Sequence, residues 1–180
     1  MSGNTDLAAM FDSLAATHRE LARQLTALRR LVDAAESSGL DGSMRQEARR
    51  VLDFFNGKAR QHHLDEEAHV FPPLLASPDQ AVVAVARRLR QDHGWLEENW
   101  LNIEPAIAAA SQGSQWFDLA ELRHGLEVFD ALYRDHMMLE ESVAYPQARA
   151  RLQAWEQAGA GREMAARRVQ AAPRSPGHEA

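Results

Sequence analysis

The sequence predicts an all-α protein, an up-down-up-down four-helix bundle. Between a few breaks that contain glycine, serine or proline, long segments carry apolar residues at alternating spacings of three and four, as one face of a helix requires. No run of alternating β-branched residues lies between turn signals, so strands are not expected. Three short connections between four such segments are typical of antiparallel neighbours in a bundle.

The expected helices lie between these breaks. They cover roughly residues 6–37, 42–75, 79–112 and 115–155. Asp41 or Ser43 is a suitable N-cap for the second helix, because a short polar side chain accepts hydrogen bonds from the first free N–H groups. Ser77 and Ser114 are the candidate N-caps of the third and fourth helices.

The chain divides into a bundle and a tail. Residues 1–155 are expected to form the bundle, which is long enough to bury roughly 70% of its unfolded surface. Residues 156–180 are expected to form a flexible, disordered tail, because Gly-Ala-Gly from Gly159 onwards is followed by Ala-Pro-Arg-Ser-Pro-Gly. Pro72-Pro73 should end or bend the second helix early, since proline disfavours helical geometry in the preceding residue.

The composition excludes several classes of protein. The chain has 180 residues, a net charge of -6 and no cysteine, so disulfide scaffolds, thiolate zinc fingers, iron–sulfur clusters and cysteine nucleophiles are ruled out. The acidic balance argues against a nucleic-acid or anionic-membrane partner. No run approaches the roughly 20 apolar residues of a membrane span, and the early Asp6 and Asp12 do not fit a signal peptide. We therefore expect a cytoplasmic protein.

Each apolar stripe contains a histidine, and two stripes also contain a glutamate four residues later. These six residues are His18, His62, Glu66, His93, His136 and Glu140. Burying imidazoles and carboxylates without partners costs several kcal/mol per charge. A metal ion attracts both groups, and residues four apart lie about 5–6 Å apart on one helix face, so each His–Glu pair can chelate. Six such side chains exceed what one ion normally takes, which favours two ions.

The positions of these histidines along the helices predict a common layer. His18 lies about 19 residues before the first connection and His62 about 20 residues after its helix begins, so at 1.5 Å per residue both are about 30 Å from that end. His93 and His136 lie about 19 and 21 residues from the third connection. Antiparallel helices of these lengths bring the six side chains together.

The same residues belong to an internal repeat. The pattern His-x3-Glu-Glu-x3-aromatic-Pro begins at His62 and again at His136, with an offset of 74 residues. His18 recurs as His93, with an offset of 75. The bundle is therefore expected to contain two helix pairs related by a pseudo-twofold axis. Each pair contributes one lone histidine and one His-x3-Glu, which would place two metals side by side.

Taken in order, these motifs resemble the hemerythrin-like HHE cation-binding domain family. The residues that carry the resemblance are His18, His62-His63-Leu64-Asp65-Glu66-Glu67 with Phe71-Pro72, His93 with Glu97, and His136-x3-Glu140-Glu141. The resemblance covers about residues 6–150 and implies a non-haem di-iron centre, two iron ions bridged by carboxylates and an oxo or hydroxo group. It implies terminal imidazoles from His18, His62, His93 and His136, and bridges from Glu66 and Glu140.

Four further residues are candidate ligands for which another role remains open. Glu97 occupies the position four after His93, where oxygen-carrying hemerythrins have histidine, and its carboxylate is expected to reach the same metal. Glu67, Glu97 and Glu141 could equally be solvated or support a ligand, and His63 lies about 100° round the helix from the stripe. A site with one imidazole fewer and one carboxylate more argues against reversible oxygen carriage but not against di-metal binding.

The sequence favours a non-haem di-iron protein that binds or senses a small ligand, such as oxygen, nitric oxide or peroxide, or iron itself. A first alternative is a di-iron enzyme that turns over peroxide or nitric oxide, which requires an open coordination position. A second is a structural site in which zinc or manganese holds the bundle together.

Overall fold

A computed structural model describes the backbone of residues 2–37, 39–114 and 117–171, and the side chains of residues 7–37, 39–114 and 117–159. Within these ranges every regular element is a helix, as predicted. In chain order they are α1 (Ser2–Ser37), α2 (Gly42–Asp53), the π-helix η1 (Phe54–Ala59), α3 (Arg60–His69), α4 (Phe71–Leu75), α5 (Gln80–Ser111), α6 (Leu119–Leu139), the π-helix η2 (Glu140–Ala144) and α7 (Tyr145–Ala171).

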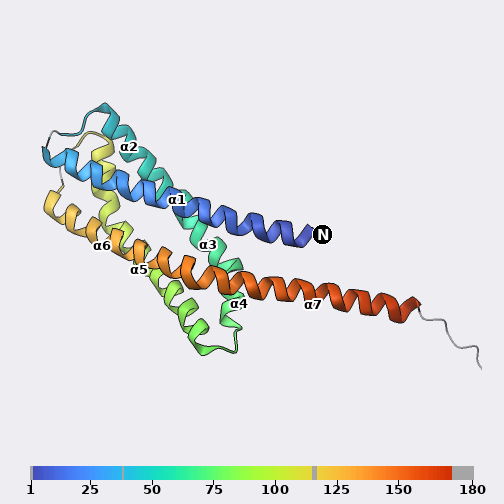
Figure 1. Cartoon of the computed structure of the whole chain (residues 1–180). Coiled ribbons are helices and arrows are strands. Elements are labelled where there is room, and N and C mark those ends of the chain that lie inside the picture. The colour runs from blue at the N-terminus through green and yellow to red at the C-terminus, as the bar shows by residue number, and fades with distance from the viewer. Residues whose placement is uncertain (1, 38, 115–116, 172–180) are drawn as a thin grey trace, which may run out of the picture.

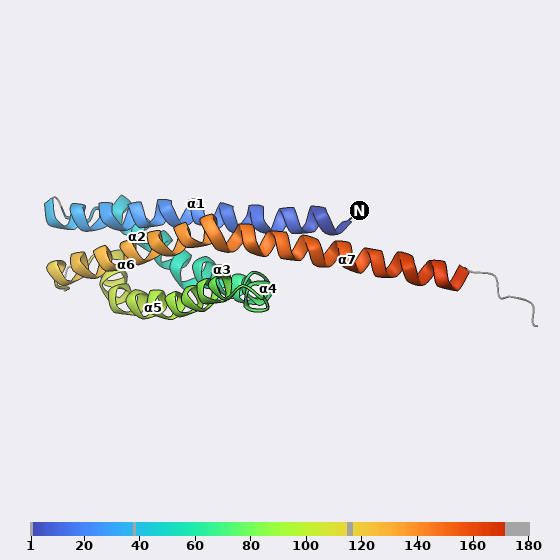
Figure 2. The same cartoon turned by 60° about the horizontal axis from the view of Figure 1, so that its bottom comes forward.

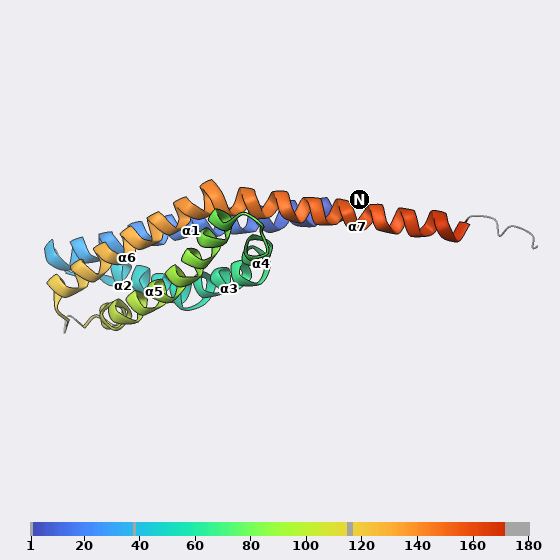
Figure 3. The same cartoon turned by 90° about the horizontal axis from the view of Figure 1, so that it is seen from below.

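These elements form four long rods packed as an up-down-up-down bundle (Figure 1). The first and third rods are α1 and α5. The second consists of α2, η1, α3 and α4 end to end, and the fourth of α6, η2 and α7. Helix α1 packs on α2 and α6, and α5 packs on the same two helices, which closes the bundle. Figure 2 shows α1 and α7 running side by side, and in Figure 3 the short α4 lies close to α7, on which it packs.

The helix starts differ in part from those predicted. Asp41 caps α2, as expected, because its carboxylate accepts hydrogen bonds from the N–H groups of Ser43 and Met44 at 2.9 Å. The N-caps of α5 and α6 are aspartates rather than Ser77 and Ser114. At the start of α5 the hydroxyl of Ser77 accepts a hydrogen bond from Asp79 N–H, and Asp79 itself caps the helix through Ala81 N–H.

The second and fourth rods are irregular near their prolines. As predicted, the second rod does not run unbroken through Pro72: α3 ends at His69 and α4 begins at Phe71. In the fourth rod Pro146 has no N–H to donate, which favours a local departure from α-helical bonding, and Tyr145 N–H bonds to the carbonyl of Glu140 in η2. This five-residue turn places Tyr145 one turn beyond Glu140 on the same face.

Two apolar clusters fill the bundle, one on each side of a polar layer. The larger contains Leu21, Ala59, Leu96 and Tyr133, and the smaller contains Leu14, Val70, Leu89 and Ala144. Each rod passes from one cluster to the other through a histidine: His18, His62, His93 or His136. The polar layer that the sequence predicted is therefore enclosed by apolar side chains at both ends.

The last helix is longer than expected. It continues to Ala171 and projects past α1 in Figure 1, because residues 162–171 are rich in Ala, Arg, Glu and Met, whose helix propensity outweighs the cost of the two nearby glycines. Residues 172–180 lie outside the described residues, and the division of the chain after residue 155 stays a prediction. Among the described residues, no helix combines the length and apolar character that crossing a bilayer demands.

Candidate metal centre

The structure brings the six predicted side chains together at the centre of the bundle. All six are buried: His18, His62, Glu66, His93, His136 and Glu140. They form two groups in which the potential ligand atoms lie within 4.8 Å of one another, and these groups are His18, His62, Glu66 and Glu140, and Glu66, His93, His136 and Glu140. Because both glutamates occur in both groups, the layer offers two adjacent metal positions that share two carboxylates.

Each shared glutamate lies between two histidines. Glu66 Oε1 is 3.3 Å from His62 Nε2, and Glu66 Oε2 is 3.5 Å from His93 Nε2. Glu140 repeats the arrangement, with Oε1 3.0 Å from His136 Nε2 and Oε2 3.2 Å from His18 Nε2. The Nε2 atoms of all four imidazoles therefore point at the carboxylates in the middle of the layer.

Most of these close approaches lack hydrogen-bond geometry. Within the described side chains, the buried nitrogen and oxygen atoms without a hydrogen-bond partner all belong to this layer or to His63 beside it: His62 Nδ1 and Nε2, His63 Nε2, Glu66 Oε2, His93 Nε2, His136 Nδ1 and Nε2, and Glu140 Oε1 and Oε2. Unpartnered buried polar atoms cost about 1–3 kcal/mol each. The inward Nε2 atoms and the carboxylate oxygens among them converge, and a metal ion would satisfy these together.

Exposed or half-buried carboxylates face the outer nitrogens of three imidazoles. Glu141 Oε1 lies 2.8 Å from His18 Nδ1, and Glu67 Oε1 lies 2.9 Å from His93 Nδ1. Asp92 Oδ2 approaches His136 Nδ1 to 3.7 Å. A carboxylate at Nδ1 keeps the proton on that nitrogen and leaves Nε2 free to bind a metal. Glu67 and Glu141 therefore support histidines and do not enter either four-residue group.

The pseudo-twofold relation extends to the aromatic rings beside the layer. Phe71 stacks on His93 and Tyr145 stacks on His18, each with 5.3 Å between ring centroids. The two halves differ in the hydroxyl: Tyr145 Oη lies 2.9 Å from His18 Nε2 and donates a hydrogen bond to Glu66 Oε1. Neither Tyr145 nor Asp92 was predicted from the sequence to take part in the site. The internal repeat could have pointed to Tyr145, because Phe71 and Tyr145 occupy equivalent positions and differ by one hydroxyl group.

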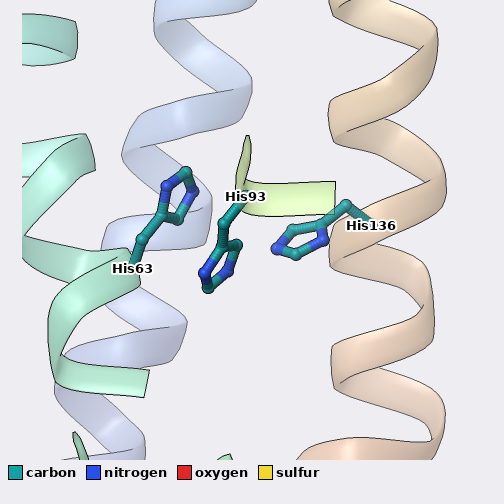
Figure 4. Close-up of side chains that lie close together, drawn as sticks. All are labelled: His63, His93 and His136. Carbon is teal, nitrogen blue, oxygen red and sulfur yellow. The ribbon is translucent and has the colours of Figure 1, made fainter. Parts of the chain in front are cut away.

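His63 lies against the layer on the side of α5 and α6. Its ring stacks on that of His93 with 4.1 Å between centroids, and one nitrogen from each of His63, His93 and His136 lies within 4.8 Å of the others. Figure 4 shows the three imidazoles projecting toward one another from α3, α5 and α6. The structure thus brings His63 close enough to act with His93 and His136.

Glu97 does not reach the layer. Its Oε2 accepts a hydrogen bond from Arg60 Nε at 3.0 Å, and its Oε1 bonds to the same guanidinium, at the surface between α3 and α5. The predicted contact with the metal held by His93 is therefore not formed. The buried face of α5 continues from His93 to Leu96 and Trp100, so the residue three positions on, rather than four, faces inward.

Burial and the charge of Glu140 act in opposite directions on the histidines of the layer: the carboxylate raises the pKa of His136 to about 10 and also raises that of His18, whereas burial prevails at His62. Burial lowers the pKa of His62 to about 3, so this imidazole is neutral at neutral pH and one of its ring nitrogens has a lone pair available for a metal. Burial and the neighbouring Glu140 raise the pKa of Glu66 to about 7, because two carboxylates in an apolar bundle oppose each other's ionisation. A cation between the carboxylates would remove that opposition.

Comparison with known proteins agrees with this geometry. The chain is 29% identical over 161 residues to an uncharacterized protein of Haemophilus influenzae, an alignment that covers 87% of this chain and 88% of that protein. No solved structure matches the chain. The family model of the hemerythrin HHE cation binding domain matches residues 9–148, which include all six side chains of the layer. The chain belongs to the hemerythrin HHE cation-binding domain family.

Proposed function

We propose that this protein is a non-haem di-iron protein that binds or senses a small ligand such as oxygen, nitric oxide or peroxide, or iron itself. One observation carries the proposal: two buried groups of two histidines and two glutamates share both glutamates. His18 and His62 would hold one ion and His93 and His136 the other. Glu66 and Glu140 would bridge them.

The donor set favours iron. Imidazole nitrogen suits iron, zinc, copper and nickel, carboxylate oxygen suits harder ions, and a mixture without thiolates fits iron in both common oxidation states. The two glutamates would offset part of the charge of two cations within an apolar bundle. When bound, an iron pair would supply redox chemistry and a coordination position for a small molecule.

The protein's own residues would prepare the site for that ligand. The two apolar clusters on either side of the layer keep bulk water away from it. The carboxylates of Glu67 and Glu141 fix the proton of His93 and His18 on Nδ1. A surface depression of about 600 Å³, lined in part by His18, Met137 and Glu141, lies against one edge of the layer and supports access for a molecule of few atoms.

Metal analysis with an optical spectrum tests the proposal. Protein produced in iron-supplemented medium should contain about two iron ions per chain and absorb in the near ultraviolet. Recovery of zinc or manganese instead of iron would favour the structural site, and steady-state consumption of peroxide or nitric oxide would favour the enzyme. One ion or none after careful iron loading would contradict a di-iron site.

A further inference from the structure

Tyr145 is a polar residue at which the two halves of the bundle differ. Its repeat partner Phe71 covers His93 with the same centroid separation with which Tyr145 covers His18. A phenyl ring therefore suffices for packing at this position. The hydroxyl of Tyr145 adds a donor atom to one metal position, and the Phe71 ring adds none to the other.

The hydroxyl oxygen touches two atoms of the same four-residue group. It lies 2.9 Å from His18 Nε2 and within hydrogen-bond distance of Glu66 Oε1. Two donor atoms at right angles around an ion with bonds of about 2.1 Å are about 3 Å apart. The separation between Tyr145 Oη and His18 Nε2 is thus that of neighbouring ligands of one ion.

We propose that Tyr145 binds, through its phenolate oxygen, the metal ion held by His18 and His62. This inference rests on the proposed function, because it adds a ligand to one of the two proposed iron positions. On binding, the O–H bond of the phenol breaks, an oxygen–metal bond forms and the proton leaves to solvent without transfer of an electron. Tyr145 also lines a surface depression that contains Glu141 and Arg149.

The alternative is a neutral phenol that only donates a hydrogen bond to Glu66. Spectroscopy separates the two, since a phenolate bound to ferric iron gives a charge-transfer band in the visible range and resonance-enhanced ring vibrations, whereas a hydrogen-bonded phenol gives neither. The chain has two tyrosines, so any tyrosinate signal can be assigned to one of them by replacing each in turn. Tyr133, the second, is buried in the larger apolar cluster and provides the matched control.

The experiment uses the full-length protein loaded with ferric iron, with metal content measured on every sample. Wild-type protein and Tyr133→Phe, whose remaining tyrosine is Tyr145, should both show the visible band and the tyrosinate vibrations. Tyr145→Phe should keep both irons and lose the band completely. The spectra of wild type and Tyr133→Phe show whether Tyr145 binds iron as a phenolate, even if Tyr145→Phe does not fold.

Two results would overturn the inference while leaving the di-iron site intact. They are two bound irons in wild-type protein without tyrosinate vibrations, and a band that persists in folded, iron-loaded Tyr145→Phe. Wild-type protein that takes up no iron would contradict the proposed function, and the inference with it. Iron analysis therefore distinguishes the two failures.

Discussion

Glu141 Oε1 lies 2.8 Å from His18 Nδ1 although 123 residues separate the two in the chain. The same contact recurs between Glu67 and His93 in the other half of the bundle. In each case the carboxylate comes from the residue directly after a shared glutamate, Glu140 or Glu66. The Glu-Glu pair in each motif thus combines one inward carboxylate with one that orients a histidine of another helix.

Replacing Glu141 by Gln should weaken metal binding about 10–100-fold, because an amide no longer holds the proton on His18 Nδ1 as firmly. Glu141 is 58% exposed, so the fold should be unaffected. Competition with a chelator of known affinity measures the effect. Glu98→Gln, at an exposed site on α5, is the matched control and should bind as wild type does. Equal metal affinities of the Glu141 and Glu98 variants would contradict the orienting role of Glu141.

Metal should stabilise the folded chain. At 100 times the dissociation constant, a ligand specific to the native state contributes about 2.7 kcal/mol, which corresponds to roughly 5–11 °C in Tm for a chain of this size. His62→Ala and His136→Ala should lower metal content and Tm together, as followed by circular dichroism. His124→Ala, at an exposed position on α6, should change neither. Identical Tm values for metal-free and metal-loaded protein would contradict binding in the buried layer.

Replacing Glu97 by Gln should leave metal content unchanged. The carboxylate pairs with Arg60 at the surface, and such pairs contribute about 0.2–1 kcal/mol. A double-mutant cycle with Arg60→Gln, measured by urea unfolding, should give a coupling energy in that range. Loss of metal from the Glu97 variant would instead support Glu97 as a metal ligand, as its spacing from His93 predicted.

His63→Ala should weaken the metal position held by His93 and His136 and spare the other. Burial lowers the pKa of His63 well below its usual range, so the imidazole is neutral, and its buried Nε2 has no hydrogen-bond partner. Titration of metal-free protein should show one tight site and one weakened about tenfold or more. His69→Ala, exposed on the same helix, is the control. Two unchanged sites in His63→Ala would make His63 a packing residue.

The sequence was sufficient for the helical class and for the convergence of the six side chains, because both depend on the helix period and on counting residues from the connections. Tyr145 could not be predicted from the helix period for a local reason. In a regular α-helix the residue five after Glu140 turns away from the stripe, and only the wider turn of η2 brings it back. The role of Asp92 could not be predicted either, because its contact with His136 depends on how α5 and α6 are rotated relative to each other. The expectation for Glu97 failed for a related reason, since a spacing of four does not say which side of the stripe the residue occupies.

The internal repeat has a consequence for how the two metal positions can differ. Each half is a helical hairpin with one lone histidine and one His-x3-Glu, so two copies of one hairpin would supply the whole set of six side chains as a symmetric dimer. In such a dimer any substitution would alter both positions alike. A single chain is free of that constraint, and its two halves differ beside the layer, with Tyr145 opposite Phe71 and His63 opposite Met137. If two ions bind as proposed, these differences would give each of them its own affinity and potential.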